Sequence, residues 1–138
     1  MSAEIISGKD VAADVRADVK AAVATLPAQP TLAVVLVGED PASQVYVRNK
    51  IRQTEECGMR SIHHRMPAEA TQDEVEQTIA NLNADKDVDG ILLQLPLPDG
   101  LNEASAIEKI DPDKDVDGLT EASAGRLSLG KPGLRPCT

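Results

Sequence analysis

The sequence TLAVVLVG, residues 31–38, decides how this chain folds. Its apolar residues follow one another without polar alternation, which is typical of a strand buried on both faces of a parallel sheet. The next residues, Glu39-Asp40-Pro41, place acidic residues and a proline at the start of a segment with helical spacing that Gly58 ends. A buried strand that leads directly into a helix predicts the first half of a parallel strand–helix–strand unit.

The same order of strand and helix is repeated along the chain. Residues 61–66 form a second candidate strand, which is less apolar and is expected near an edge of the sheet. A capping box at residues 71–74, Thr-Gln-Asp-Glu, begins a helix whose apolar residues recur at helical spacing. A third strand is predicted at residues 90–95, followed by a short helix at about residues 102–110.

The two ends of the chain carry weaker signals. Valine recurs every four residues from Val11, which predicts an amphipathic helix over about residues 9–25 that begins near Ser7. After Asp111, glycine and proline are frequent. There we expect mostly loop, with a short strand near residues 117–119.

We therefore expect a single α/β domain over residues 1–138. It is a three-layer α/β/α structure in which helices cover both faces of a small, mostly parallel sheet. In such folds, binding sites gather at the carboxyl ends of the strands. Here those ends are Gly38-Glu-Asp40, Gln94-Leu-Pro96 and the segment around Asp117. The helix after the first strand is expected to bring Lys50 back toward Gln94.

Composition restricts the kinds of function. The chain is 41% apolar and carries a net charge of −9, from 23 acidic and 14 basic residues. Such an acidic surface repels phosphate backbones, so we expect no nucleic-acid partner. No apolar run approaches the length of about 18 residues that a membrane span needs, and the start lacks a secretory signal. Cys57 and Cys137 are the only cysteines and lack metal-binding spacing. We expect a cytoplasmic protein with free thiols.

The chain contains neither Phe nor Trp, and its one tyrosine, Tyr46, stands four residues before Lys50. A helix turns by about 100° per residue, so Ser43, Tyr46 and Lys50 lie within about 60° of one another. Lys50 then points along the inward face, where poor solvation lowers a lysine pKa and makes it a usable acid, base or nucleophile. The alternative is a surface pair, with the lysine stem lying on the tyrosine ring.

Two further polar features lie in the predicted strands. Gln94 interrupts the apolar run Ile-Leu-Leu-Gln-Leu, residues 91–95. One alternative is that its amide forms hydrogen bonds with a loop. The other is that the amide faces Lys50 or a ligand. His63 and His64 are adjacent, so in a strand they point to opposite faces and cannot form one site. We expect no metal site.

The hexapeptide DKDVDG occurs twice, at residues 85–90 and 113–118. It matches the first half of a calcium-binding loop, which has acids at positions 1, 3 and 5 and glycine at position 6. The bidentate Glu that such a loop needs at position 12 is Pro96 in one copy and Ala124 in the other. We therefore expect no calcium site. The first copy is typical of a solvated turn, whereas Asp117 lies in the segment expected to cap the sheet.

Three long segments of the chain occur together in a recognisable order. They are Val37-Gly38-x3-Pro41-Ala-Ser43-x2-Tyr46-Val-x2-Lys50, Gly90-Ile-Leu-Leu-Gln94-Leu-Pro96-Leu-Pro98 and Asp113-Lys-Asp-Val-Asp117-Gly118. In this combination the chain resembles the bifunctional methylenetetrahydrofolate dehydrogenase/cyclohydrolase family (FolD). The final residues, GKPGLRPCT at 130–138, fit the start of that family's next motif. The resemblance covers essentially the whole chain.

The resemblance implies an enzyme of one-carbon metabolism. Such an enzyme oxidises 5,10-methylenetetrahydrofolate to the 5,10-methenyl form with NADP and hydrolyses that product to 10-formyltetrahydrofolate. It implies that Lys50 is the catalytic group, which transfers a proton and activates water at the one-carbon bridge. It also implies that Gln94 is hydrogen-bonded to Lys50 and helps to set its protonation.

The resemblance also implies how a folate substrate is bound. Tyr46 would stack on the folate, and Ser43 would support the site. Asp117 would accept hydrogen bonds from the pterin ring, because a carboxylate suits paired N–H donors. The backbone around Leu93 and Leu95 would line the pocket.

The chain departs from the family in two respects. The family usually carries Asn near the position of Ser123. The sequence also ends within a motif, and no G-x-G-x-x-G follows a strand. We therefore expect residues 1–138 to be the folate-binding catalytic domain, without the NADP-binding domain and without dehydrogenase activity of their own. The full-length enzyme is expected to be a homodimer. The alternative is a non-catalytic, truncated α/β interaction module.

Overall fold

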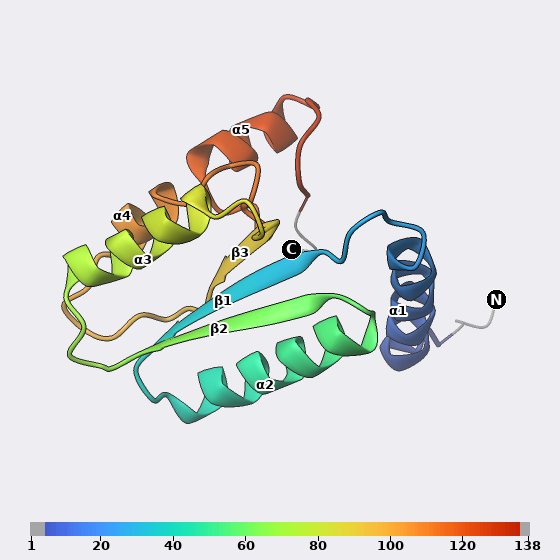
Figure 1. The fold of residues 1–138 in the computed structure, drawn as a ribbon, viewed down its shortest axis with the longest axis horizontal. Coiled ribbons are helices and arrows are strands. Elements are labelled where there is room, and N and C mark those ends of the chain that lie inside the picture. Colours follow the sequence, from blue (N-terminus) through green and yellow to red (C-terminus); the bar gives the residue numbers. More distant parts are fainter. Residues whose placement is uncertain (1–4, 136–138) are drawn as a thin grey trace.

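The computed structural model describes residues 5–135 (Figure 1). The elements are α1 (Gly8–Val23), β1 (Thr31–Val37), α2 (Pro41–Glu56), β2 (Arg60–Met66), α3 (Gln72–Ala84), β3 (Gly90–Leu93), α4 (Glu103–Glu108) and α5 (Glu121–Ser128). Strands and helices alternate from α1 to α4, as predicted from the sequence, and a further helix follows. Within the described residues, no helix is long and apolar enough to cross a membrane. Cys137 and the last residues of the final motif lie outside the described part.

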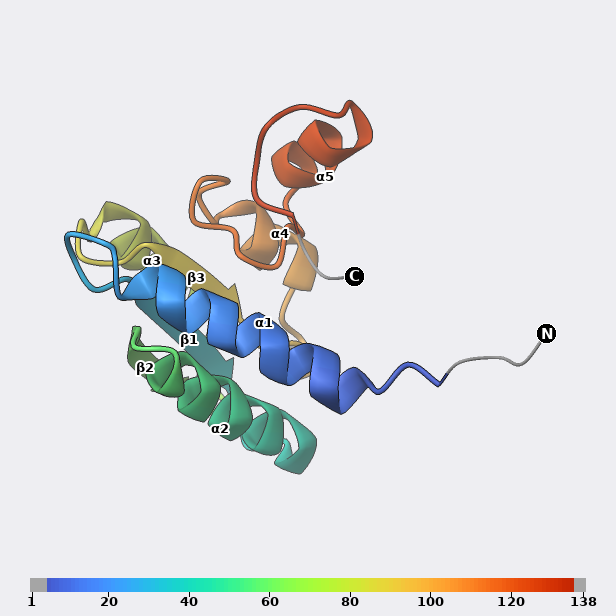
Figure 2. The same ribbon diagram turned by 90° about the vertical axis from the view of Figure 1, so that its right-hand side faces the viewer.

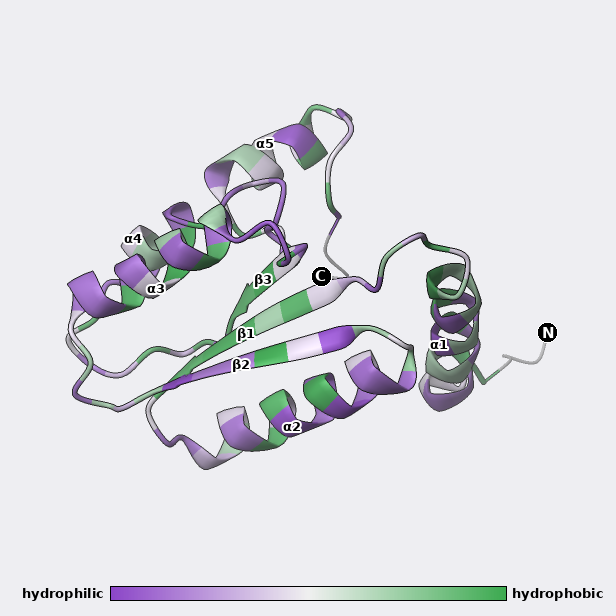
Figure 3. Ribbon diagram, viewed as in Figure 1, coloured by the Kyte–Doolittle hydropathy of each residue, from purple (hydrophilic) through white to green (hydrophobic). Residues whose placement is uncertain are grey.

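The sheet has three parallel strands in the order β2-β1-β3. In this register Val34 of β1 lies between His63 of β2 and Leu92 of β3. The continuous apolar run therefore occupies the central strand, where neighbours cover both edges and helices cover both faces. Figure 3 shows the contrast between the apolar β1 and β3 and the mixed β2. The predicted edge position of β2 is confirmed.

Helices cover both faces of the sheet, which confirms the three-layer α/β/α prediction. Alternate residues of β1 point to opposite faces and so contribute to two separate cores. On one face Val35 packs with Val75 and Ile79 of α3. On the other face Val34 packs with Val47 of α2.

The starts of α2 and α3 follow the capping signals in the sequence. Asp40 accepts a hydrogen bond from the backbone N–H of Ser43 at 2.7 Å, and Pro41 occupies the first helical position. Gly58 follows α2 with a φ of +86°, a left-handed conformation that favours glycine. In α3, the capping box joins Thr71 and Glu74 reciprocally.

Helix α1 is confirmed, with Ser7 as its N-cap, but its apolar face is not buried as its amphipathic pattern suggests. Val11 and Val15 are 51% and 55% exposed, and no residue of the helix is buried. The helix contacts the rest of the domain near the end of α2, where the thiol of Cys57 lies 3.7 Å from the carbonyl of Arg16. Figure 2 shows α1 in front of one end of the sheet, rather than over a face of it.

Two predictions for the later part of the chain are wrong. The third strand ends at Leu93 instead of residue 95, because the chain turns away from β1 after Gln94. The short strand expected at residues 117–119 is absent, and only an isolated bridge joins Asp115 to Ile91. Helix α5 was not predicted. Its only buried residue is Ser123, so it lacks the apolar periodicity that reveals a helix in a sequence.

Candidate functional site

Lys50 and Gln94, separated by 44 residues in the sequence, meet in space. Lys50 lies in α2, on the face of the sheet opposite α3, and Gln94 follows β3. The ammonium Nζ of Lys50 donates a hydrogen bond to Oε1 of Gln94 at 3.3 Å. Lys50 is half-buried, and Gln94 is buried at 9% exposure. The predicted approach of the lysine to this amide is confirmed.

The local backbone orients the Gln94 side chain. Its backbone N–H donates to the carbonyl of Val35 at 2.9 Å and so extends the sheet by one residue. Its Nε2 donates to the carbonyl of Leu95 at 2.6 Å. Because an amide has one donor end and one acceptor end, the bond to Leu95 leaves Oε1 directed at Lys50. Leu93 is buried in the core under α3, and Leu95 packs partly against the same core.

Asp117 is the third member of this site and, with Lys50, one of its two charged side chains. Burial raises the pKa of its carboxyl group, and the charge of Asp115 raises it further, while the nearby Lys50 ammonium lowers it. Lys50 is therefore close enough to act on Asp117 electrostatically, although the two belong to distant parts of the chain. The structure thus brings Lys50, Gln94 and Asp117 into one neighbourhood.

Tyr46 and Ser43 differ in burial, although both lie within two turns of Lys50 on α2. The expectation that Ser43, Tyr46 and Lys50 share one inward face is wrong. Ser43 is buried at 2% exposure, whereas Tyr46 is 60% exposed. The buried stripe of the helix is formed by Ser43, Val47 and Thr54, and Lys50 and Tyr46 lie at its margin. The tyrosine ring is therefore open to solvent one turn before the lysine.

Ser43 forms hydrogen bonds with Asp40 that were not predicted from the sequence. Hydrogen bonds from its backbone N–H and then from its hydroxyl group lower the pKa of Asp40. This local bond keeps the first turn of α2 closed. The signal was present in the sequence as an acidic N-cap three residues before a serine.

The acids of the two DKDVDG copies are largely engaged by the protein itself. Asp85 Oδ1 accepts from the backbone of Asp87, and Asp89 Oδ2 accepts from the backbone N–H of Thr31 at 2.8 Å. Asp115 accepts from two backbone N–H groups of its own loop, at Leu119 and Thr120. Among residues 5–135 there is no group of three His, Cys, Asp or Glu side chains arranged to hold a metal.

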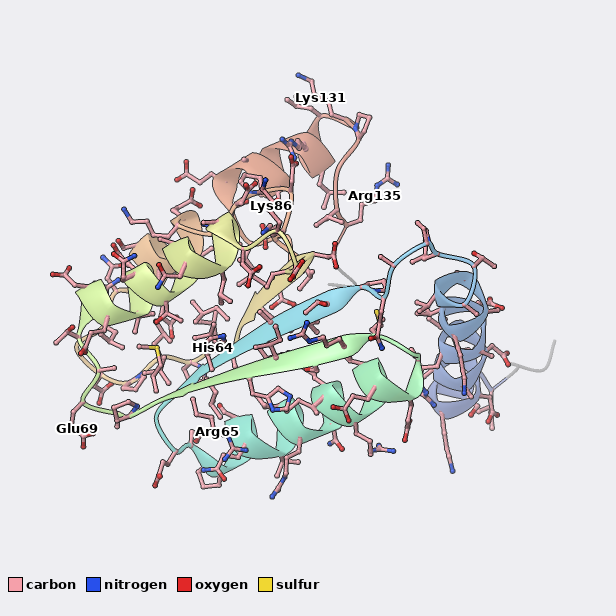
Figure 4. All side chains as sticks on the ribbon, in the orientation of Figure 1. His64, Arg65, Glu69, Lys86, Lys131 and Arg135 are labelled. Carbon is pink, nitrogen blue, oxygen red and sulfur yellow. The ribbon has the colours of Figure 1, made fainter. Side chains whose placement is uncertain are left out.

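Strand β2 directs adjacent side chains to opposite sides of the sheet. His64 lies toward α3, near Thr78 and Leu82, whereas Arg65 lies toward α2, near Gln44 (Figure 4). The ring of His63 contacts Ser61, as expected of a neighbour on the same face. The prediction that the two histidines point apart is consistent with this alternation.

A cavity of about 450 Å³ lies at the carboxyl ends of β1 and β2. Its lining includes Gly38, Gln44, Arg65 and Glu69, and it does not include Lys50 or the residues that meet it. The cavity is therefore separate from the lysine–amide pair. Its side-chain charges are of both signs, so it has no clear preference for an anion or a cation.

The model of the family "Tetrahydrofolate dehydrogenase/cyclohydrolase, catalytic domain" matches residues 6–117 of this chain. A curated relative, the bifunctional protein FolD of Hyphomonas neptunium, is 72% identical over 138 residues, which are all of this chain and 47% of the relative. The chain thus spans about half the length of the curated relatives that it matches.

Solved structures of similar proteins share the fold. The bifunctional enzyme FolD of Campylobacter jejuni is 40% identical, with a TM-score of 0.89 over 94% of this chain and 48% of that one. The methylenetetrahydrofolate dehydrogenase of the silkworm Bombyx mori is 37% identical, with a TM-score of 0.94 over 98% of this chain and 48% of that one. FolD of Trypanosoma brucei, solved with NADP cofactor and inhibitor, is 32% identical, with a TM-score of 0.92 over 99% of this chain and 49% of that one.

Proposed function

This chain belongs to the tetrahydrofolate dehydrogenase/cyclohydrolase family, and we propose that residues 1–138 form its folate-binding catalytic domain. The proposed reactions are oxidation of 5,10-methylenetetrahydrofolate to the methenyl form and hydrolysis of that product to 10-formyltetrahydrofolate. The observation that carries the proposal is the 3.3 Å hydrogen bond between Lys50 and Gln94 at the end of the sheet. A half-buried lysine hydrogen-bonded to a neutral amide oxygen is able to exchange a proton with a substrate.

In hydrolysis, water attacks the carbon that bridges two nitrogens of the folate. We assign to Lys50 Nζ the proton transfers that accompany this attack. Gln94 holds the ammonium in place through Oε1, because its Nε2 is already bound to the carbonyl of Leu95. An uncharged partner fixes the position of the lysine without stabilising its charge as strongly as a carboxylate does.

The remaining proposed contacts place the folate beside the lysine. Asp117 would accept hydrogen bonds from paired N–H donors of the pterin, and Tyr46 would stack on the folate with its exposed ring. The backbone of Leu93 and Leu95 would border the ring system, and Ser43 would support the start of α2. The support for this arrangement is that Lys50 acts electrostatically on Asp117 and that the ring of Tyr46 is open.

Within residues 5–135, the two helix starts that follow β1 and β2 do not suit the pyrophosphate of NADP. The N-terminus of α2 is capped by Asp40, and that of α3 by the box of Thr71 and Glu74. Carboxylates at these positions repel a pyrophosphate and occupy the N–H groups that would bind it. NADP accepts the hydride in the family reaction. We propose that NADP is held mainly by a part of the enzyme outside this chain. Residues 1–138 alone would therefore lack dehydrogenase activity.

The first test is binding of 5-formyltetrahydrofolate, a stable reduced folate, by the 138-residue chain in calorimetric titration. Tyr46→Ala and Asp117→Ala are expected to weaken binding. Arg48→Ala, a change on the exposed side of the same helix, is the control and is expected to leave affinity unchanged. Equal affinity for all four proteins would remove Tyr46 and Asp117 from the folate site.

The second test is turnover. The chain is joined to the part of the Hyphomonas relative that it does not cover, and cyclohydrolase activity is followed by the loss of methenyl absorbance. Lys50→Met is expected to abolish hydrolysis, while Arg48→Met retains it. Hydrolysis at the parental rate by the Lys50 variant would exclude this lysine as the proton-transferring group.

A second candidate function is a non-catalytic interaction module. Its specific support is a set of exposed apolar side chains before, within and after α1: Ile5, Ile6, Val11, Val15 and Leu26. Such surface is typical of a protein contact. Light scattering combined with the folate titration separates the two functions, because self-association without folate affinity would favour the module.

A further inference from the structure

We propose that Asp115 is a positioning residue of this site, whose buried carboxylate holds the loop that presents Asp117 to the folate. The inference rests on the proposed function, because it assumes that Asp117 contacts the substrate. It concerns a residue to which neither the sequence motifs nor the reaction chemistry assigns a role. Asp115 and Asp117 are two residues apart, yet the carboxylate of one is bonded within the loop and that of the other lies within electrostatic reach of Lys50.

The Asp115 carboxylate forms the centre of a closed loop. It is 1% exposed, and its two oxygens accept hydrogen bonds from the backbone N–H groups of Leu119 at 3.3 Å and Thr120 at 2.9 Å. Its own carbonyl accepts from the N–H of Gly118 at 3.2 Å. Gly118 has a φ of +63°, which lets the chain reverse within four residues. Asp117 lies within this reversal, so the geometry of the Asp115 bonds fixes its position.

The carboxylate also joins the loop to α5. Thr120 is the N-cap of that helix, and its hydroxyl donates to Ser123 Oγ at 3.0 Å. Both residues are buried, so the network is shielded from water. A buried and fully bonded polar network has one preferred arrangement, since any other leaves a donor or acceptor unpaired.

On its other side the loop is fastened to the sheet and to α3. The carbonyl of Lys114 accepts from the N–H of Ile91 in β3 at 2.8 Å. The ammonium of Lys114 donates to three carbonyls at the end of α3, those of Leu82, Asn83 and Asp85, at 3.1, 2.9 and 2.7 Å. A cation at a helix C-terminus is stabilised by the unpaired carbonyls there. Asp117 therefore has a fixed attachment both before and after it.

Asp115 also affects the protonation of Asp117. Burial of Asp115 acts to raise its own pKa, but the hydrogen bonds from Thr120, Ser123 and Leu119 together outweigh burial and lower it. Asp115 is thus ionised in the fold, and its charge contributes to the raised pKa of Asp117. The charged groups that act on Asp117 are Lys50 from α2 and Asp115 from its own loop.

The test is Asp115→Asn in the 138-residue chain, titrated with 5-formyltetrahydrofolate between about pH 5 and about pH 8. The amide keeps the shape but loses the charge and one acceptor, so affinity at neutral pH is expected to fall about tenfold. Without the neighbouring charge the pKa of Asp117 falls. The acid pH at which half of the binding is lost is therefore expected to move downward.

Asp113→Asn is the matched control, because Asp113 lies in the same loop but its side chain is exposed and forms an ion pair with Arg126 on the surface. It is expected to change neither affinity nor the pH midpoint. A merely structural Asp115 would lower Tm and leave the pH midpoint where it is, and that result would overturn the proposal. If the Asp115 variant does not fold, Ser123→Ala decides, with a smaller change expected in the same direction. If Ser123→Ala binds the folate with the affinity and the pH midpoint of the parent chain, the proposal is overturned.

The outcome separates this inference from the proposed function. If Asp117→Ala binds the folate as tightly as the parent chain, the proposed contact with the pterin fails. If Asp117→Ala weakens binding but Asp115→Asn does not, the folate site stands and only the positioning role fails.

Discussion

Replacing Gly90 by alanine tests how closely the Asp117 loop packs on the sheet. Gly90 begins β3, and a Cβ atom at this position would lie 2.5 Å from Cγ1 of Val116 and 3.5 Å from Cδ1 of Leu32. Carbon atoms pack best at about 3.5–4.0 Å, so Val116 must move by about 1 Å or more. The backbone bond between Lys114 and Ile91 opposes such a movement, because it fixes the chain two residues earlier.

The expected loss of stability follows from this overlap. Overpacking a filled site by one methyl group lowers the free energy of unfolding by about 1–3 kcal/mol. The Leu32 contact at 3.5 Å is ordinary and adds nothing to this value. Val116 immediately precedes Asp117, so the displacement is also expected to weaken folate binding. Urea unfolding is followed by circular dichroism, since the chain has no tryptophan for fluorescence.

Two further variants make the measurement decisive. Gly125→Ala is the control, because a Cβ at Gly125 in α5 meets nothing within 4 Å and is expected to stabilise the helix by about 0.5–1 kcal/mol. Adding Val116→Ala to Gly90→Ala removes the overlapping Cγ1 atom, so the double variant is expected to be more stable than the sum of the single effects. Full stability and unchanged folate affinity in Gly90→Ala alone would refute the close-packing argument.

Three other changes have defined outcomes. Asp117→Asn is expected to raise Tm near pH 7. The pKa of Asp117 is raised in the fold, so ionisation of its carboxyl group destabilises the folded chain at neutral pH. Below the unfolded pKa of about 3.9 the carboxyl group is protonated in both states, and this loss of stability is absent. Thermal melts of the parent chain and the variant, near pH 7 and below the unfolded pKa, check this, and the same Tm for both proteins near pH 7 would contradict it. Thr71→Ala removes half of the capping box and is expected to lower the free energy of urea unfolding by about 1 kcal/mol, whereas the exposed Thr25→Ala changes it by less than about 0.5. Ile79→Ala, at a fully buried position under the sheet, is expected to lose about 2–5 kcal/mol, and a loss below about 1 would show that the core collapses around the cavity.

The sequence by itself determined the elements whose signals are local. An uninterrupted apolar run at residues 31–37 forms the central strand because only that position covers both faces and both edges. Asp40 and Thr71 begin helices because a side-chain oxygen there satisfies free N–H groups. The contact between Lys50 and Gln94 could also be predicted from the sequence, since parallel strands bring their carboxyl ends to one edge of the sheet.

Other features had no local signal. Helix α5 is held by a buried polar network instead of an apolar stripe, so its spacing resembles that of a loop. The valine stripe of α1 has helical spacing, but Val11 and Val15 are largely exposed within the described structure. Periodicity predicts that a helix forms, and it does not reveal what covers the helix.

The two DKDVDG copies show most clearly what only the tertiary structure decided. In the first copy Val88 is buried in the core, Asp89 bonds to the start of β1 and the glycine begins a strand. In the second, the middle aspartate Asp115 is buried and Gly118 adopts a left-handed turn. Six identical residues have the same local preferences. The neighbours supplied by the rest of the chain therefore select which carboxylate is buried and hydrogen-bonded and which one comes under the electrostatic influence of Lys50.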